Sequence, residues 1–281
     1  MKRFSPRNIL YVVWFLVYYL VMSLCFGAQK ESFLIVGIIY LVFILIAFTP
    51  IAEKMMRRLE GARELRTAKE KDRLQPLFEE VYESALQENP SLFKNIRLFT
   101  EDSLDINAFA MGKKTLAITK GSAELLTDEE LKGVIAHELG HFAHGDTMAL
   151  LVMTVGNMIF SLFYKLLKLI ANILYPLFAS RDGTFIIKGV WWIVNTIINF
   201  FMFIGDLILM PISRANEFMA DRFAYDCGYG NELISALDKM DTLYKKEKLR
   251  FRDYLRSTHP SITKRIEKLE TIEVEQSIEA M

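Results

Sequence analysis

The chain has 281 residues, and its 34 basic and 34 acidic residues give a net charge of zero. This balance gives no indication of a nucleic-acid partner. The two cysteines, Cys25 and Cys227, are too few for a cysteine zinc site, and their distance apart in the sequence argues against a disulfide. Hydrophobic residues make up 52% of the chain and are gathered in long uncharged runs, which predicts an integral membrane protein of one or two domains.

Two apolar runs open the chain, at Ile9–Ala28 and Phe33–Ala52, and neither contains a charged residue. Each is long enough to cross a hydrocarbon core of roughly 30 Å as a helix, so residues 1–52 are expected to form two transmembrane helices. Basic residues flank the outer ends of the pair and place both ends in the cytoplasm by the positive-inside rule. Cleavage of the first run as a signal peptide is the alternative, which the closely following second run disfavours.

Residues 53–146 form a polar segment of changing periodicity. The stretch Glu53–Glu88 has a helical pattern, and the charged residues of 62–73 within it are expected to form an exposed helix surface. Short strands are predicted at Asn95–Phe99, Ile106–Met111 and Thr115–Thr119, the last two joined by a Gly-Lys-Lys turn.

A helix is strongly signalled after Thr127, because Thr127 and Glu130 have the spacing of a capping box and Gly145 is a suitable stop. This helix contains the pattern H-E-x-x-H, formed by His137, Glu138 and His141. Residues four apart lie on nearly the same helix face, so both imidazoles can reach one cation. Glu138 projects beside that cation, in the position of a base acting on a metal-bound water.

A catalytic zinc site needs a third protein ligand and an open position. Glu217 is the best candidate, and Asp221, one turn later, is placed to accept a hydrogen bond from a ligand histidine. His144 is the alternative ligand, but it lies only three residues after His141 on the same helix and is poorly placed for a tetrahedral site.

Two further apolar runs separate the two parts of this motif, at Thr147–Tyr164 and Ile186–Ile212, with a turn at Arg181-Asp182-Gly183. Residues 147–212 are therefore expected to form a membrane hairpin of two spans. The polar segments 53–146 and 213–281 on either side of it are together long enough for one globular domain.

The sequence His-Glu-Leu-Gly-His, followed after two membrane runs by Ser-Arg-Ala-Asn-Glu-Phe-Met-Ala-Asp, resembles the HtpX-type integral-membrane zinc metallopeptidases. These belong to the gluzincin clan and are related to the CAAX prenyl proteases. The resemblance implies an α+β, mostly helical fold: a zincin-like peptidase domain with a short mixed sheet, plus about four transmembrane helices. In it, residues 53–146 carry the metal helix and residues 213–281 the third zinc ligand. His144 departs from the family, where asparagine is commoner.

The resemblance also implies the roles of individual residues. One zinc ion per chain is bound by His137, His141 and Glu217, and Glu138 is the catalytic base. Asp221 and Asp146 resemble acids that support the ligand histidines.

Substrate contacts are implied in two further places. The small apolar strand preceding the metal helix looks like the edge that pairs with substrate, through Asn107, Ala108, Phe109 and Ala110; an ordinary core strand is the alternative. His259, in a Thr-His-Pro-Ser motif, and Arg265 resemble groups that stabilise the oxyanion, although His259 is equally suited to tie the C-terminal helices together.

The expected function is a zinc-dependent endopeptidase that hydrolyses membrane or membrane-adjacent proteins on the cytoplasmic side, for quality control in the bacterial cytoplasmic membrane. Its expected partners are such substrates and the lipid bilayer. A processing peptidase for one peptide or lipoprotein is an alternative. A non-enzymatic zinc-binding scaffold is another, but structural sites normally use four ligands, often cysteines. A small transporter would require repeats that the two hairpins do not show.

Overall fold

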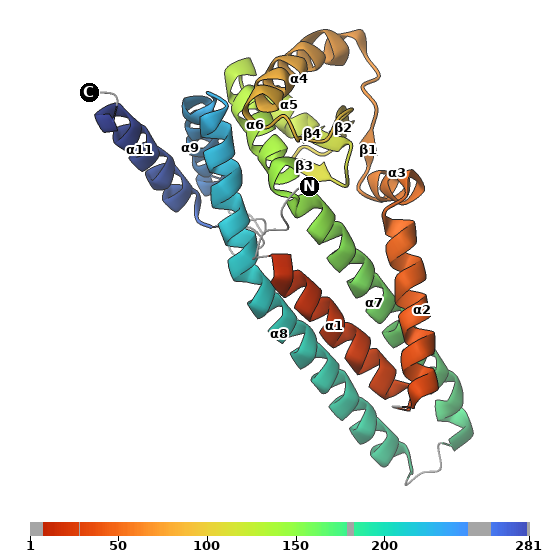
Figure 1. Cartoon of the computed structure of the whole chain (residues 1–281). Coiled ribbons are helices and arrows are strands. Elements are labelled where there is room, and N and C mark those ends of the chain that lie inside the picture. Colours follow the sequence, from red (N-terminus) through yellow and green to blue (C-terminus); the bar gives the residue numbers. More distant parts are fainter. Residues whose placement is uncertain (1–7, 28, 179–182, 247–259, 280–281) are drawn as a thin grey trace. The chain divides into compact units, whose positions relative to one another are not determined.

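The computed structural model describes residues 8–27, 29–178, 183–246 and 260–279, which are mostly helical (Figure 1). They divide into two compact units. Unit 1 combines Phe48–Leu151 with Ile212–Met281, and unit 2 combines Pro6–Ala47 with Val152–Pro211. Two long helices, α7 (Asp146–Phe178) and α8 (Gly183–Asp226), contribute residues to both units.

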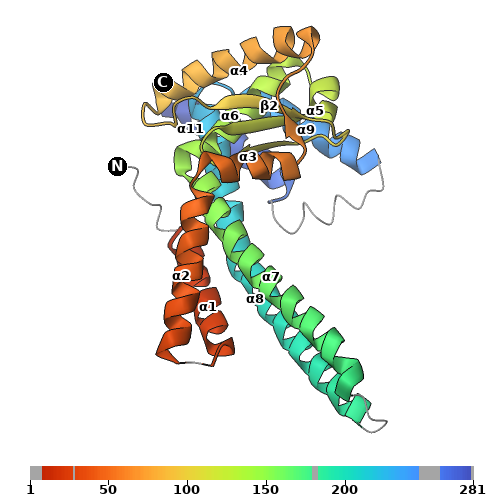
Figure 2. The ribbon, with the colours of Figure 1, turned by 90° about the vertical axis from the view of Figure 1, so that its right-hand side faces the viewer.

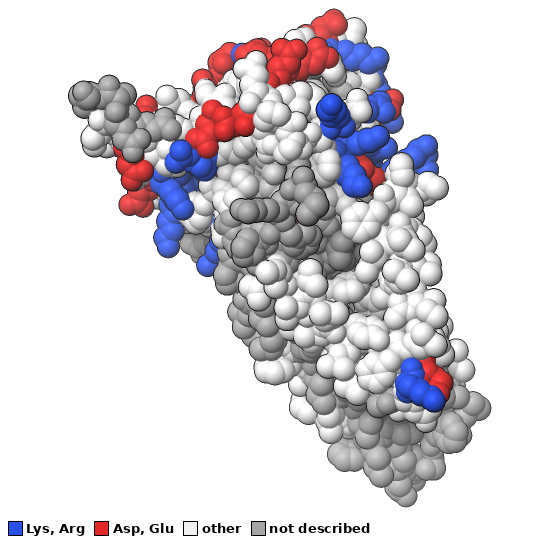
Figure 3. Space-filling model, in the orientation of Figure 1, with Lys and Arg blue, Asp and Glu red and all other residues white. Residues whose placement is uncertain are grey.

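Unit 2 is built from apolar helices. Helix α1 (Asn8–Cys25) packs on α2 (Lys30–Ala47), with the rings of Phe15 and Tyr40 edge to face at 5.0 Å. Tyr18 reaches Phe160 of α7 at 5.3 Å. The described surface of unit 2 carries almost no charge on the face seen in Figure 3. Among the described residues, α2 is the one helix that has both the length and the composition of a membrane span.

A four-stranded mixed sheet lies in unit 1, in the order β1-β2-β4-β3. Its strands are β1 (Ala62–Arg63), β2 (Arg97–Glu101), β3 (Ala108–Met111) and β4 (Thr115–Thr119). Strands β2 and β4 are parallel, whereas β3 is antiparallel to β4 and β1 to β2. Because side chains alternate along a strand, Leu116 and Ile118 of β4 join the main core while Ala117 and Phe99 face the other side.

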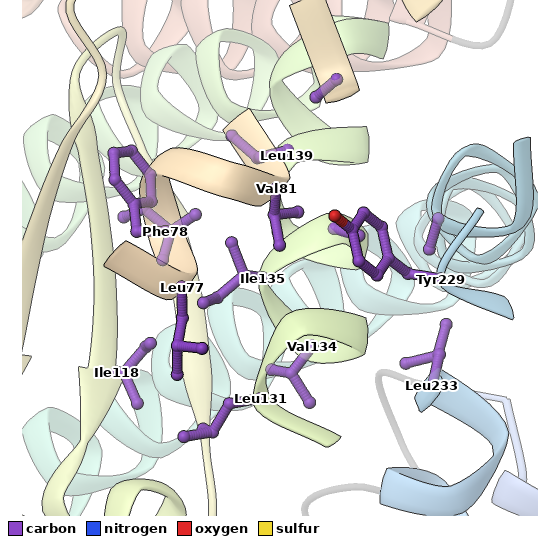
Figure 4. Packing of buried hydrophobic residues seen from close by; sticks show 14 of the residues in the cluster. Leu77, Phe78, Val81, Ile118, Leu131, Val134, Ile135, Leu139, Tyr229 and Leu233 are labelled. Carbon is purple, nitrogen blue, oxygen red and sulfur yellow. The ribbon is translucent and has the colours of Figure 1, made fainter. Parts of the chain in front are cut away.

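Helix α6 (Asp128–His144) is at the centre of unit 1 and packs on α4 (Ala68–Glu88), α9 (Gly230–Lys246), β3 and β4. Figure 4 shows Leu131, Ile135 and Leu139 of this helix among side chains from α4, β4 and α9. Helix α11 (Ile262–Glu279) packs on α9, and the short α5 (Lys120–Leu125) follows β4. The main core therefore lies on the side of the sheet on which α6 packs, the helix with the H-E-x-x-H pattern.

The helical pattern predicted over Glu53–Glu88 is confirmed in part, because the stretch is interrupted and does not form one continuous helix. The stretch instead forms α3 (Pro50–Leu59), then β1, then α4. Gly61 breaks the helix with a φ of 71°, and Thr67 starts α4 afresh with a capping box. The charged stretch 62–73 is not only an exposed helix surface, because Arg63 forms ion pairs with Asp102 at 2.7 Å and with Glu70 at 2.8 Å. Strand β1 and helix α5 were not predicted.

The predicted strands and the helix after Thr127 are confirmed with small shifts. Strand β4 has the predicted bounds, β2 begins at Arg97 rather than Asn95, and β3 begins at Ala108 rather than Ile106. Helix α6 has both halves of the Thr127–Glu130 capping box and ends at His144, followed by the C-cap Gly145, whose φ is 77°. The turn predicted at Arg181-Asp182-Gly183 falls on residues 179–182, outside the described ranges, apart from Gly183.

Gly133 lets α6 approach α9 closely. A Cβ at this position would lie 2.3 Å from the backbone nitrogen of Leu233 and 2.6 Å from the carbonyl carbon of Glu232. Backbone atoms cannot rotate away as a side chain can, so any substitution must push the two helices apart.

We predict that Gly133→Ala lowers the free energy of unfolding by about 2 kcal/mol, because a clash of about 3 kcal/mol outweighs a helix-propensity gain of about 1 kcal/mol. Denaturation of the purified protein, followed by circular dichroism, measures this change. Gly189→Ala is the control, since a Cβ at Gly189 meets no atom within 4 Å. Equal stability of the two variants would contradict the close packing.

Glu130 connects the start of α6 to α9. Besides capping Thr127, its carboxylate accepts hydrogen bonds from Lys239 at 2.8 Å and Ser235 at 3.1 Å. Burial raises the pKa of Glu130, but these hydrogen bonds outweigh burial and hold the pKa below its usual value.

We predict that Glu130→Gln lowers the free energy of unfolding by about 1–2 kcal/mol near neutral pH. Since the folded pKa is lowered, the carboxylate's contribution is present above the unfolded pKa of about 4.3 and is lost as the pH falls through the folded pKa. Melting curves of wild type and variant should therefore converge in acid. A stability difference between wild type and Glu130→Gln that persists in acid would contradict this role of the Glu130 carboxylate. An equally large loss of stability in the exposed Glu129→Gln would contradict it as well.

Candidate metal centre

Three side chains from two helices meet in unit 1: His137 and His141 of α6 and Glu217 of α8. One ligand atom from each lies within 4.8 Å of the others. Nε2 of His137 is 3.5 Å from Oε2 of Glu217, and Nε2 of His141 is 3.6 Å from Oε1 of the same carboxylate. His137 and Glu217 are buried, whereas the His141 side chain is 16% exposed.

The two helices can approach because of Gly140, which lies between the two histidines. A Cβ on Gly140 would come within 2.8 Å of Cα of Ala220 in α8. Glu217 is three residues before Ala220, and therefore less than one helical turn away. The small pair Gly140 and Ala220 thus sets the distance between the histidine helix and the carboxylate.

Two further carboxylates hold the histidine rings. Oδ1 of Asp221 lies 2.9 Å from Nδ1 of His137, and Oδ2 of Asp146 lies 3.3 Å from Nδ1 of His141. Each contact fixes the ring and its tautomer and leaves Nε2 directed at Glu217. Two imidazole nitrogens and one carboxylate, with both rings braced by acids, are a donor set that fits zinc.

Arg265 of α11 completes the buried network. Its Nε and Nη2 form a fork on Asp221 at 2.8 and 2.5 Å, and its Nη1 is 3.3 Å from Glu217. The same Nη2 lies 3.2 Å from Nδ1 of His137. The guanidinium therefore lies against the groups that hold the histidine. His259, predicted to act with Arg265, is outside the described residues.

The site stabilises positive charge between its carboxylates. Burial and the charge of Arg265 lower the pKa of His137, yet hydrogen bonds to Asp221 and Glu217 outweigh them and raise it to about 9. Burial also lowers the pKa of His141, but Asp146 and Glu217 raise it above its ordinary value. The pKa of Asp221 is lowered, since the charges of Arg265 and His137 overcome the effect of burial.

His144 is not part of the three-residue group. Its Nδ1 lies 2.7 Å from the carbonyl oxygen of Gly140, one turn back on the same helix, and its ring is edge to face with Phe223 at 6.1 Å. The structure thus brings together His137, His141 and Glu217, as the sequence predicts, and places His144 on the neighbouring face of α6.

The small apolar strand before the metal helix is β3, an edge of the described sheet. It contains Ala108, Phe109 and Ala110, which are half-buried, and it packs on α6. Asn107 lies just outside the strand, and its carbonyl oxygen accepts hydrogen bonds from Thr119 and Ser122. Strand β3 is therefore an edge strand of the described sheet.

Sequence reasoning placed Arg265 in the site but missed two features of it: the role of Gly140 between the helices and the groups that Arg265 contacts. Gly140 sets the distance between α6 and α8, and its only signal in the sequence is that a glycine occurs inside the H-E-x-x-H pattern. The contact between Arg265 and Asp221 joins helices far apart in the chain, and nothing in the local pattern of either helix announces it.

Comparisons with known proteins agree with this geometry. The model of Peptidase family M48 matches residues 68–273. A Protease HtpX homolog of Bacillus subtilis is 30% identical over 185 residues, covering 60% of each chain. One from Helicobacter pylori is 32% identical over 205 residues, covering 66% of this chain and 63% of the relative. The chain thus spans about three-fifths of the length of these relatives.

The fold is similar to the crystal structure of S. mikatae Ste24p, with a TM-score of 0.50 and 20% identity, over 91% of this chain and 61% of that one. The family model covers well over half of the chain and includes all three converging side chains. This chain belongs to peptidase family M48.

Proposed function

We propose that this chain is a zinc-dependent endopeptidase that hydrolyses peptide bonds of membrane or membrane-adjacent proteins. The observation that carries the proposal is the convergence of His137, His141 and Glu217, with Glu138 adjacent to the first histidine on the same buried helix. Among the described residues this group has three ligands, which leaves a coordination position for water and favours an enzyme over a structural zinc scaffold.

His137, His141 and Glu217 would hold the zinc ion. When bound, zinc supplies positive charge that polarises the substrate carbonyl and lowers the pKa of a water molecule from 15.7 to about 7. Asp221 and Asp146 would orient the two imidazoles and select the tautomer that leaves Nε2 available to the metal.

Glu138 is the proposed proton carrier. Its carboxylate accepts a proton from the attacking water and then delivers it to the nitrogen of the leaving amine. Glu138 is buried, as a base shielded from bulk water should be. It follows His137 directly in α6.

Arg265 is proposed as a positioning residue that acts through Asp221, Glu217 and His137, the groups it contacts. His259 remains a proposed donor to the oxyanion that forms on the substrate carbonyl. In this division of roles, Arg265 sets the geometry of the metal ligands and His259 contacts the reacting atoms.

Strand β3 is the proposed substrate edge. It is an outer strand of the sheet and packs on the metal-motif helix, so an extended peptide paired with it would run alongside α6. Small residues at Ala108 and Ala110 leave room for substrate side chains. Main-chain pairing would recognise unfolded segments with little sequence preference, which suits a quality-control protease better than a peptidase dedicated to one peptide or lipoprotein.

The membrane arrangement is part of the proposal. Helix α2 is the span candidate of the described residues, α1 is a shorter apolar helix, and α7 and α8 are long and rich in apolar residues. We propose four spans, at α1, α2 and the two runs within α7 and α8. Basic residues around the first pair favour a cytoplasmic peptidase domain, formed from segments 53–146 and 213–281, in a bacterial cytoplasmic membrane.

We predict that Glu138→Gln reduces cleavage of an unfolded membrane protein by about 10²–10⁴-fold, because the variant cannot accept the proton from water. Zinc content should stay at the wild-type value, since Glu138 is not a proposed ligand. Gel-based cleavage assays with purified, reconstituted protein, together with metal analysis, measure both quantities. A zinc chelator should abolish wild-type cleavage, and added zinc should restore it.

Glu129→Gln is the matched control, because Glu129 is an exposed carboxylate on the same helix. It should cleave at the wild-type rate. Wild-type cleavage by Glu138→Gln would end the assignment of the base, and chelator-resistant cleavage would end the assignment of zinc.

We predict that Asp221→Asn weakens zinc binding by about 10–100-fold, because an amide supports the ring of His137 less well than a carboxylate does. Competition with a chromophoric chelator measures the affinity. Asp226→Asn on the same helix is the control, since Asp226 pairs with Arg222. Unchanged affinity in Asp221→Asn, with the fold intact by circular dichroism, would show that Asp221 does not support the ligand.

A further inference from the structure

Helix α3 buries a charged face and exposes an apolar one. Its buried residues are Ala52 and Glu53, and on the opposite face Ile51 is 77%, Met55 48% and Leu59 71% exposed. These three are four residues apart and form one stripe along the helix. A surface helix in water shows the reverse arrangement, with its apolar stripe toward the core.

The charged face attaches α3 to the sheet. Oε1 of Glu53 accepts hydrogen bonds from the hydroxyl of Thr115 at 2.7 Å and the backbone of Lys114 at 3.0 Å, and its Oε2 accepts one from the backbone of Lys113 at 3.3 Å. One turn later, the guanidinium of Arg57 lies 4.4 Å from the ring centre of Phe99 and donates to Thr115. The orientation of α3 on unit 1 is therefore fixed by specific contacts.

The attachment point is the turn between β3 and β4. A Cβ on Gly112 would lie 2.7 Å from the carboxyl carbon of Glu53, so the carboxylate fits closely against this turn. Thr147 also binds the carbonyl oxygen of Gly112 at 2.8 Å. The position of α3 thus determines the position of the end of β3.

Helix α3 lies on the opposite side of the sheet from α4 (Figure 2). Phe99, which contacts Arg57 of α3, belongs to the small cluster on one side, whereas Leu74 and Phe78 of α4 belong to the main core on the other. Figure 3 shows Lys and Arg gathered over the region of α3 and β1, and Asp and Glu over α4.

Two observations identify what covers the exposed stripe. Only Phe48 and Thr49 separate Pro50, the first residue of α3, from Ala47, the last residue of the span candidate α2. Chain of this length reaches about 10 Å. Basic Lys54 and Arg58 lie beside the stripe and are exposed, as expected for a helix at the headgroup layer.

We propose that α3 is an interfacial helix whose Ile51, Met55 and Leu59 side chains insert into the headgroup and acyl boundary of the bilayer. Lys54 and Arg58 contact lipid phosphates. This inference rests on the membrane placement in the proposed function. Through Glu53, the bilayer surface then sets the depth at which the β3–β4 turn, and with it the proposed substrate edge, is held.

The test uses the full-length protein in nanodiscs of phosphatidylcholine and phosphatidylglycerol. Single cysteines are introduced into a Cys25→Ala, Cys227→Ala background and labelled with an environment-sensitive fluorophore. The stripe is probed by Ile51→Cys and Leu59→Cys. Lipids with a doxyl group near the headgroup should quench these two probes at least about threefold more than a probe at Glu83→Cys, given a burial of roughly 5–10 Å.

Glu83 is the matched control because it is an exposed helical residue of the same unit on α4, across the sheet from α3. Leu41→Cys, in α2, reports the membrane placement itself. If the Leu41 probe is quenched but the two stripe probes are quenched no more than the Glu83 probe, the interfacial helix is contradicted and the membrane placement still holds. Stripe probes that are shielded from water but unquenched by lipid also overturn it, in favour of a protein partner. An unquenched Leu41 probe overturns the membrane placement and the inference with it.

Discussion

The close approach of α6 and α8 is the constraint on which the candidate centre depends. Two histidines on one helix turn cannot complete a metal site, and their third partner is carried by a helix from a distant part of the chain. Gly140 against Ala220 allows the two backbones to come near enough for Glu217 to face both imidazoles. A larger side chain at either position would push the two helices apart and so move Glu217 away from the two histidines.

Charge explains why this arrangement calls for a cation. Four buried carboxylates surround the site, and among the described residues there the one buried guanidinium is that of Arg265. The carboxylates are those of Glu138, Asp146, Glu217 and Asp221. Buried carboxylates in such excess are costly unless positive charge compensates them. The excess of buried negative charge raises the pKa values of His137 and His141. The same excess favours binding of the proposed zinc ion.

The parts of the structure that were predictable from sequence are those specified by short-range patterns. Helix α6 has its cap, its stripe and its stop within one stretch, and Glu217 was identifiable from the resemblance and from its spacing to Asp221. The break at Gly61 was not, because the residues around it have helical character and only the glycine's positive φ and the ion pairs of Arg63 reveal the interruption. The contact of Arg265 with Asp221 was likewise hidden, since it joins α11 and α8, which are far apart in the chain.

The order of the site residues along the chain has a consequence for biosynthesis. His137 and His141 leave the ribosome before the whole hairpin of α7 and α8, while Glu217 and Arg265 follow it. At ordinary translation speeds this delay is on the order of ten seconds. During that interval the nascent polypeptide has the histidine pair without its carboxylate partner, so the three-residue candidate centre cannot yet form.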